Sequence, residues 1–280
     1  MPELPEVETV RRVLRRALGG KKIVAVEVPP DEIVLKCVDP EVIRQALIGR
    51  TVVEVGRKGK TWWLELDEMP WVYGHLGMAG WIRQLGKPTI RLREHGEAPF
   101  EDPEGRPRFL KLLLEAEDGE RIAFTDGRRL ARLWLGGLPA NEKKLNELGP
   151  DMFDDPWTVE TLAARLVGKK APIKAVLLDQ TIFCGVGNWI ADEVLYQARI
   201  APKRLGGTLD KDEIQRLIDN LADILTKAVD AGADHDLFPK DWLFHVRWDG
   251  KKGTDQIGGE QIVREAVGGR TTAWVPSLQH

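Results

Sequence analysis

The sequence predicts an α+β protein with several domains. Strand-like runs dominate the first half of the 280-residue chain, helical periodicity dominates residues 150–235, and short β-like runs return in residues 236–280. The length alone suggests two or three domains. The hydrophobic content of 42% is sufficient for packed cores, and no apolar run reaches membrane-spanning length. The N-terminus lacks the features of a signal peptide, so we expect a cytoplasmic, nucleoid-associated location.

The first half is predicted to form a β-rich domain over residues 1–135. Residues 5–18 carry apolar side chains at helical spacing, and the helix ends at Gly19-Gly20. Residues 85–107 are polar and rich in Pro and Gly, which is typical of a surface loop. Strands are predicted at 23–28, 51–55, 61–66, 71–75, 109–114 and 121–124, with a short helix after Asp39-Pro40. This pattern predicts a two-layer β-sandwich with the N-terminal helix against it.

The second half is predicted to begin with a helical domain over residues 150–235. Its last helix starts at a capping box formed by Asp210 and Glu213. The four expected helices span 158–166, 173–178, 188–197 and 210–231. Residues 236–280 are predicted to be a third domain, with β-like runs at 243–248, 261–264 and 271–275.

Charge and cysteine content limit the possible functions. The net charge of −3 and the pI near 6.0 are unusual for a nucleic-acid-binding protein, so DNA binding would require basic residues to gather on one face. Cys37 and Cys184 lie in apolar stretches and are predicted to be buried thiols. Two isolated cysteines without a Cys-x-x-Cys motif cannot build a four-ligand zinc site without help from His, so we expect no metal; we also expect no cofactor.

The N-terminal residues can carry chemistry. Removal of Met1 would expose the secondary amine of Pro2, and an α-amine titrates at about 7.7–8.0, so it is partly neutral near pH 7. A neutral amine can attack an aldehyde carbon to form a Schiff base, and nearby Glu3 and Glu6 can move protons. The alternative is that Pro2 and Pro5 simply open a helix.

The run Met-Pro-Glu-Leu-Pro-Glu-Val-Glu-Thr at residues 1–9 resembles the N-terminus of formamidopyrimidine-DNA glycosylases, in the Fpg/endonuclease VIII family. A second match is Gly185-Val186-Gly187-Asn188 before a predicted helix, since glycines and a helix N-terminus favour phosphate binding. This turn is similar to the family's helix–two-turns–helix segment, which implies DNA contacts by Asn188, Lys169 and Lys174.

Further family positions fall in the first half of the chain. Lys60 matches a lysine that contacts phosphate and assists proton transfer. The turn from His75 to Gly80 resembles the family turn whose methionine, here Met78, fills the gap left by an everted base; His75 is expected to contact DNA. Arg108 is expected to replace a phosphate-contacting histidine of the relatives.

Residues 126–130 resemble a family loop that enters the DNA stack. The resemblance implies that Arg128 enters the void, that Leu130 wedges the opposite strand, and that Arg129 also binds DNA. Gly127 and Leu130 stand where the family has proline and phenylalanine.

The C-terminal segment resembles a family zinc finger that has lost its metal ligands. Arg270 matches the finger arginine that contacts phosphates. Val275 and Leu278 occupy the positions expected for the last cysteine pair, and the first pair is also missing. We therefore expect a zincless β-hairpin finger held by apolar packing, with Gly250–Gly253 at its flank.

The resemblance implies a monomeric, bifunctional DNA glycosylase and abasic-site lyase acting on damaged double-stranded DNA. The Pro2 amine would form a Schiff base, and the strand would be cut by β- and δ-elimination with Glu3, Lys60 and Arg270 assisting. Two alternatives stay open: a lesion-binding protein with reduced turnover, and an enzyme that uses Pro2 on small carbonyl compounds. The preferred lesion is also open, because residues 232–248 do not match the loop that caps oxidised guanine in relatives.

Overall fold

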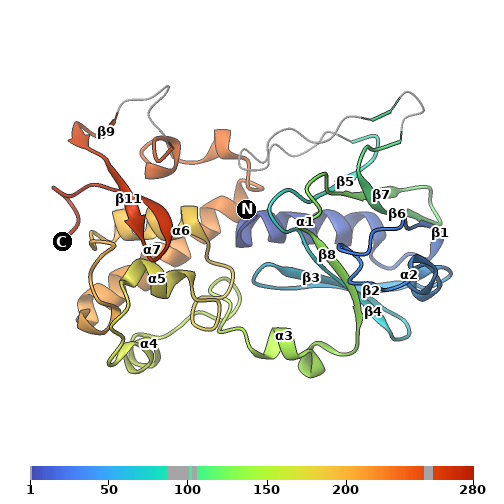
Figure 1. Cartoon of the computed structure of the whole chain (residues 1–280), viewed down its shortest axis with the longest axis horizontal. Coiled ribbons are helices and arrows are strands. Elements are labelled where there is room, and N and C mark those ends of the chain that lie inside the picture. Colours follow the sequence, from blue (N-terminus) through green and yellow to red (C-terminus); the bar gives the residue numbers. More distant parts are fainter. Residues whose placement is uncertain (1, 88–100, 103–105, 249–254) are drawn as a thin grey trace. The chain divides into compact units, whose positions relative to one another are not determined.

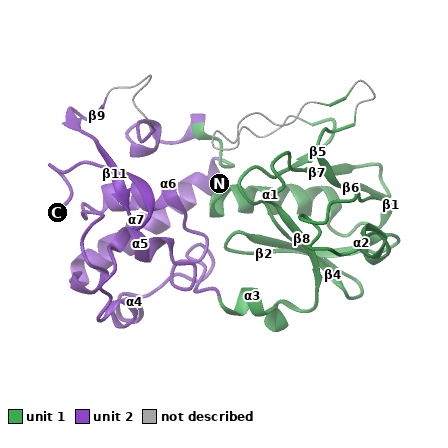
Figure 2. Ribbon diagram, viewed as in Figure 1, with its two compact units in different colours: residues 1–147, 232–235 green, residues 148–231, 236–280 purple. Residues whose placement is uncertain are grey.

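A computed structural model describes residues 2–87, 101–102, 106–248 and 255–280. The chain divides into two compact units (Figures 1 and 2). The first unit contains residues 1–147 and 232–235, and the second contains residues 148–231 and 236–280.

The first unit is built on two four-stranded antiparallel sheets. One sheet has the order β1-β6-β7-β5, and the other has the order β2-β3-β4-β8. The strands are β1 (Ile23–Glu27), β2 (Val52–Lys58), β3 (Thr61–Leu66), β4 (Trp71–His75), β5 (Trp81–Gln84), β6 (Leu110–Ala116), β7 (Arg121–Thr125) and β8 (Arg132–Gly136). Alternate residues of β3 and β6 are buried, as expected for strands with one face on a core. Trp62 and Phe124, one from each sheet, meet edge to face with ring centroids 6.1 Å apart. The predicted sandwich is therefore confirmed.

The N-terminal helix α1 (Leu4–Leu18) contacts strands of both sheets. Its apolar residues at helical spacing, including Val7, Leu14 and Leu18, are buried, and its packing is the main source of its stability. The short helix α2 (Pro40–Leu47) starts at Asp39, whose side chain accepts a hydrogen bond from the Glu41 N–H. A 3₁₀ turn (Pro139–Asn141) and α3 (Lys143–Asn146) complete the unit.

The second unit is mainly helical. Its helices are α4 (Val159–Leu166), α5 (Ile173–Leu178), α6 (Asn188–Gln197) and α7 (Lys211–Asp230). The predicted capping box at Asp210 and Glu213 is present at the start of α7. Helix α6 is the central element, because it packs against α5, α7 and the C-terminal strand β12 (Arg270–Trp274).

Two small hairpins end the chain. Strands β9 (Gln256–Ile257) and β10 (Glu260–Gln261) form the first, and β11 (Val263–Val267) pairs with β12 in the second. Residues 249–254, which include Gly250–Gly253, lie outside the described residues.

Several local predictions were incomplete or wrong. Strands β5 and β8 occur where the pattern predicts none, because both are short and only partly alternating in burial. Leu243 and Phe244 lie in a 3₁₀ turn rather than a strand; both are fully buried, whereas neighbours in a strand point to opposite faces.

The two cysteines differ in burial: Cys184 is buried as predicted, but Cys37 is exposed. In the described parts of the chain, none of the helices is long and apolar enough to cross a membrane.

Candidate active site and DNA-binding surface

Two carboxylates are held at the start of α1, next to Pro2. Glu3 is the N-cap residue, and its side chain and that of Glu6 form a reciprocal capping box. The Glu6 carboxylate accepts the Glu3 N–H at 3.0 Å. Both glutamates are almost completely buried. The helix start therefore fixes two acidic side chains within one turn of the proline nitrogen.

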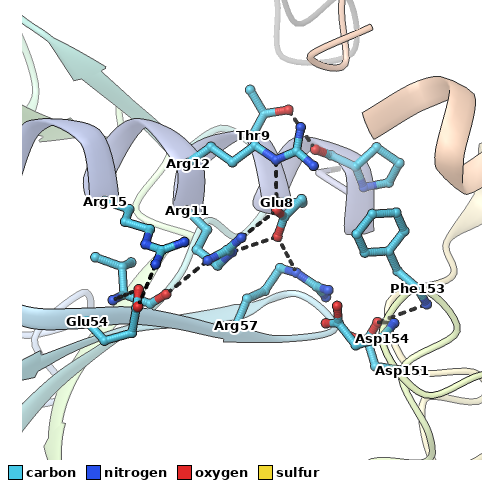
Figure 3. A network of polar contacts seen from close by, with 12 residues as sticks. Glu8, Thr9, Arg11, Arg12, Arg15, Glu54, Arg57, Asp151, Phe153 and Asp154 are labelled. Carbon is cyan, nitrogen blue, oxygen red and sulfur yellow. Dashed lines mark hydrogen bonds and ion pairs between the residues drawn. The ribbon is translucent and has the colours of Figure 1, made fainter. Parts of the chain in front are cut away.

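A buried ion network connects α1 to the turn between β2 and β3 (Figure 3). The Glu8 carboxylate accepts hydrogen bonds from Arg11 Nε at 2.8 Å, Arg12 Nε at 2.9 Å and Arg57 Nε at 3.1 Å. Burial raises the pKa of Glu8, but the guanidinium groups of Arg11 and Arg12 outweigh burial and lower it to about 2. Arg57 Nη1 also donates to the Gly59 carbonyl at 3.2 Å. This network fixes the helix relative to the turn that presents Lys60.

Lys60, in the turn before β3, lies near His75 at the end of β4. Lys60 directly precedes Thr61, which pairs with His75 across β3 and β4. Burial, together with the charges of Lys60, Lys144 and Arg132, lowers the pKa of His75 to about 4. His75 Nδ1 accepts the Gly77 N–H at 2.9 Å, so at neutral pH the ring is uncharged and shapes the turn that follows.

The two turns expected to enter DNA are packed against each other. Gly77 adopts a positive φ of 62°, and a Cβ atom there would lie 2.4 Å from the carbonyl carbon of Leu130. Only glycine permits this approach. Met78 and Leu130 are 42% and 38% exposed. The two apolar side chains predicted to be wedges therefore stand, partly exposed, on two turns that contact each other.

Two carboxylates shape residues 126–130. The Asp126 side chain is fully buried and accepts the N–H groups of Arg128, Leu130 and Ala131 at 2.9, 2.7 and 2.6 Å. Arg129 has a positive φ of 55°, and its guanidinium binds Asp31 through Nε at 3.1 Å and Nη2 at 3.0 Å.

Asp31 is a charged anchor that the sequence pattern did not reveal. Its carboxylate also accepts Lys111 Nζ at 2.6 Å. Burial raises the pKa of Asp31, but its bonds to Arg129 and Lys111 hold that pKa well below its usual range. The Arg129 guanidinium is therefore paired with a carboxylate of the protein itself, and DNA binding by this residue stays a prediction.

In the second unit, the side chain of Gln180 holds the glycine turn. Gln180 Nε2 donates to the Val186 carbonyl at 2.8 Å, and its Oε1 accepts the Gly185 N–H at 3.1 Å. The turn leads directly into α6 at Asn188. The backbone amides at this helix start are suited to an anion such as a phosphate.

Lys174 is completely buried and contacts the backbone at the end of the glycine turn. Its Nζ donates to the Asn188 carbonyl at 2.9 Å and forms a salt bridge with Asp192. Lys169 is half-buried at the other end of this region. Direct DNA contact by either lysine stays a prediction, and the contacts of Lys174 give it a positioning role.

Asp192 and Asn188 join α6 to the strand that carries Arg270. Asn188 Nδ2 donates to the Thr271 carbonyl at 3.0 Å, and Asp192 accepts the Ala273 N–H at 3.3 Å. Arg247 also binds Asp192, with Nη2 at 2.7 Å. The exposed Arg270 therefore stands on a strand that is hydrogen-bonded to the start of α6, next to the glycine turn.

An apolar cluster lies under the C-terminal hairpins. It contains Leu243, Ile262, Ala273 and Val275, with Ile257 and Leu278 packed beside them. Val275 and Leu278, which stand where relatives are expected to have zinc-binding cysteines, are thus part of this cluster. Within the described ranges, His, Cys, Asp and Glu side chains nowhere gather in a group that could hold a metal ion.

Comparison with family models places both units of the protein in the class of DNA glycosylases. The formamidopyrimidine-DNA glycosylase N-terminal domain matches residues 1–133, and the formamidopyrimidine-DNA glycosylase H2TH domain matches residues 148–238. The chain belongs to the formamidopyrimidine-DNA glycosylase family, whose members act in base excision repair.

Curated relatives and solved structures agree with this assignment. A formamidopyrimidine-DNA glycosylase of Arabidopsis thaliana is 40% identical over 280 residues, covering 100% of this chain and 71% of the relative. One from Paracoccus denitrificans is 38% identical, covering 83% of this chain and 79% of the relative. The Lactococcus lactis enzyme bound to DNA with an AP site has a TM-score of 0.80 at 28% identity, with 99% of each chain covered. The Thermus thermophilus MutM (Fpg) protein has a TM-score of 0.75 at 30% identity, covering 99% of this chain and 98% of that one.

Proposed function

We propose that this protein is a bifunctional glycosylase and abasic-site lyase that acts on damaged double-stranded DNA. The observation that carries the proposal is the buried capping box of Glu3 and Glu6 at the Pro2 terminus. Met1 lies outside the described residues, and its removal would leave the Pro2 nitrogen as a secondary amine. A carboxylic acid beside such an amine is suited to general acid–base catalysis.

The first chemical stage releases the base. The Pro2 nitrogen attacks C1′ of the damaged nucleotide, and the bond between C1′ and the base breaks with proton transfer to the departing base and sugar. The Glu3 carboxyl group supplies a proton and then removes one from the amine. The product is a cationic iminium between Pro2 and the opened sugar, and it needs no metal or cofactor.

The second stage cuts the strand. Loss of a proton from C2′ of the iminium expels the 3′ phosphate by β-elimination, and a further proton loss expels the 5′ phosphate by δ-elimination. Cations close to the two phosphates stabilise the departing charges. Lys60 and Arg270 are proposed to supply these cations, while Arg108 and the turn that leads to Asn188 hold the backbone.

The proposed substrates are oxidised or ring-opened bases that leave the helix for an active-site pocket. Similar proteins have been crystallised with DNA containing carbocyclic 8-oxo-G, FAPY-dG and an oxidised pyrimidine. We therefore propose that the first substrates to test are these three lesion types. Met78, Arg128 and Leu130 would fill the space that the everted base leaves.

The test is borohydride trapping on a duplex with one abasic site. Protein with Met1 removed, as verified by mass, should give a covalent DNA adduct that is absent when Met1 is retained. Glu3→Gln should keep lesion-duplex binding and lower base excision by about 100-fold, in the range of lost general acid–base catalysis.

The outcomes separate the candidate functions. Tight, lesion-selective binding without an adduct would support a lesion-binding protein of reduced turnover instead. Absence of both binding and adduct would contradict the proposal. Glu41→Gln, which changes an exposed carboxylate of α2, is the matched control and should behave like the parent.

A further inference from the structure

Phe109 has two properties that are unusual for a phenylalanine. Its side chain is 50% exposed, whereas the other phenylalanines among the described residues are buried or half-buried. Its backbone has a positive φ of 58°, in the left-handed region that bulky residues rarely adopt. Neither burial nor local backbone preference explains an aromatic residue here. Strained conformations of this kind are concentrated at functional sites.

The backbone of Phe109 is attached to the predicted wedge loop. Its carbonyl accepts the Asp126 N–H at 3.0 Å, just before β6. The aromatic ring lies against Gly127, where an added Cβ atom would come within 3.1 Å of the ring. A glycine at this position therefore gives the ring room to lie on the loop.

The ring lies against the loop that carries one of the two predicted wedge side chains. Met78 and Leu130 lie on the two turns that contact each other, and Phe109 touches the loop that carries Leu130. Leu130 has no aromatic face, so Phe109 supplies the flat surface on which a base can stack. The Arg108 guanidinium stands 5.3 Å from the centroid of the Phe109 ring and places a positive charge beside it. An exposed ring beside a cation is suited to nucleic acid, whose bases offer π-faces and whose backbone is anionic.

We propose that Phe109 stacks on a DNA base next to the lesion and, together with Met78 and Leu130, holds the helix open at the damaged site. This inference rests on the proposed function, because it assigns the residue that completes the wedge. The occupant of the surface is a base of damaged duplex DNA.

The decisive variant is Phe109→Gly, which removes the ring and permits the positive φ. The probe is a duplex carrying one tetrahydrofuran abasic analogue, with the undamaged duplex of the same sequence beside it. Affinities are measured by fluorescence anisotropy, and the melting temperature of each protein is recorded. We expect about tenfold weaker binding to the tetrahydrofuran duplex, the typical effect of losing one base–aromatic stack. Binding to undamaged duplex should change less than twofold, and the melting temperature should not fall, because glycine relieves the strained φ.

Four further variants show whether the ring itself is responsible. Phe109→Trp should keep the parental preference for the tetrahydrofuran duplex, since it retains an aromatic face. Leu138→Ala removes a side chain of similar exposure, 45%, beyond the opposite end of β8, and should leave binding unchanged. Gly127→Ala should displace the ring and give part of the Phe109→Gly defect, and the double variant should be no worse than Phe109→Gly.

Each other outcome has a definite meaning. If Phe109→Gly keeps the parental preference, or weakens binding to both duplexes equally, the stacking role is wrong. If the parent itself does not distinguish the two duplexes, the proposed function fails before the role of Phe109 is tested.

Discussion

Glu8 and Glu193 are buried carboxyl groups whose pKa values shift in opposite directions. Glu8 faces three arginines, which hold it ionised. Glu193 lies in α6, where burial raises its pKa to about 7 despite hydrogen bonds from Gln197 and the Phe244 backbone. The charge of Asp192 contributes to this rise. The partners of each carboxyl group therefore decide its charge at neutral pH.

Glu193 should make the stability of the protein decrease with pH. Its pKa is near 4.5 in an unfolded chain and about 7 when folded, so between these values the folded state binds more protons. The free energy of unfolding therefore falls as pH rises from about 4.5 to about 7, by roughly 1 to 3 kcal/mol. Glu193→Gln should remove this part of the pH dependence. Urea unfolding of parent and variant from pH 5 to pH 8.5 measures it.

Parent and variant are compared by how steeply the free energy of unfolding changes with pH. Its absolute value is not used, because Glu193→Gln also changes the hydrogen bonds with Phe244 and Gln197. A variant whose stability keeps the parental slope across this pH range would contradict the assignment to Glu193. Glu160→Gln, at an exposed position in the first turn of α4, should keep the parental slope.

At the scale of elements, the contact between the 75–80 turn and the 126–131 loop depends on Gly77. Gly77→Ala introduces a Cβ atom 2.4 Å from the Leu130 carbonyl, so the two turns must separate. We expect lower thermal stability and at least about tenfold weaker binding to a lesion duplex, since one base–aromatic or wedge contact is worth that much. Melting curves and fluorescence anisotropy measure the two effects.

Gly119→Ala is the control for this experiment. Gly119 also has a positive φ, of 84°, but an added Cβ atom there would meet nothing within 4 Å. Both variants carry the same kind of backbone strain, and only Gly77→Ala adds the clash. Equal losses in the two variants would show that strain alone explains the result.

The C-terminal hairpins should be stable without zinc. Val275 and Leu278 belong to the apolar cluster of Leu243, Ile262 and Ala273. Buried apolar area can replace the stabilisation that a bound metal supplies to a small domain. We expect the purified protein to contain much less than one zinc per chain and to keep its melting temperature in EDTA. Stoichiometric zinc by elemental analysis would contradict the zincless finger, while Val275→Ser should lower the melting temperature.

At the scale of the whole molecule, a net charge of −3 must be reconciled with DNA binding. We expect binding to depend on a few local cations rather than on the total charge. If Lys60, Arg108 and Arg270 each contact one phosphate, raising salt from 50 to 200 mM should weaken duplex binding roughly 40-fold. Anisotropy titrations across this range measure the slope. Removing one cation, as in Arg270→Gln, should reduce the slope by about one, and a slope near zero would exclude phosphate contacts as the source of affinity.

Long elements with clear periodicity were predicted well. The apolar spacing of residues 5–18 and the alternation of residues 61–66 each correspond to one regular element. Short β5 and β8 were missed, and residues 243–248 were assigned wrongly, because their structure depends on partners distant in the chain. The candidate site follows the same division: the Pro2, Lys60, Met78 and Asn188 motifs are visible in the sequence, whereas Asp31 and Phe109 are not.

The sequence by itself determined the α+β class, the family and the order of the candidate motifs, because periodicity, capping residues and short motifs are local properties of the chain. Only the tertiary structure decided how those motifs are held: Glu8 against Arg57, Asp31 against Arg129, Gly77 against Leu130, and Asp192 against Lys174. The physical reason is that burial and low dielectric give these contacts their strength, and burial exists only after distant segments have packed together.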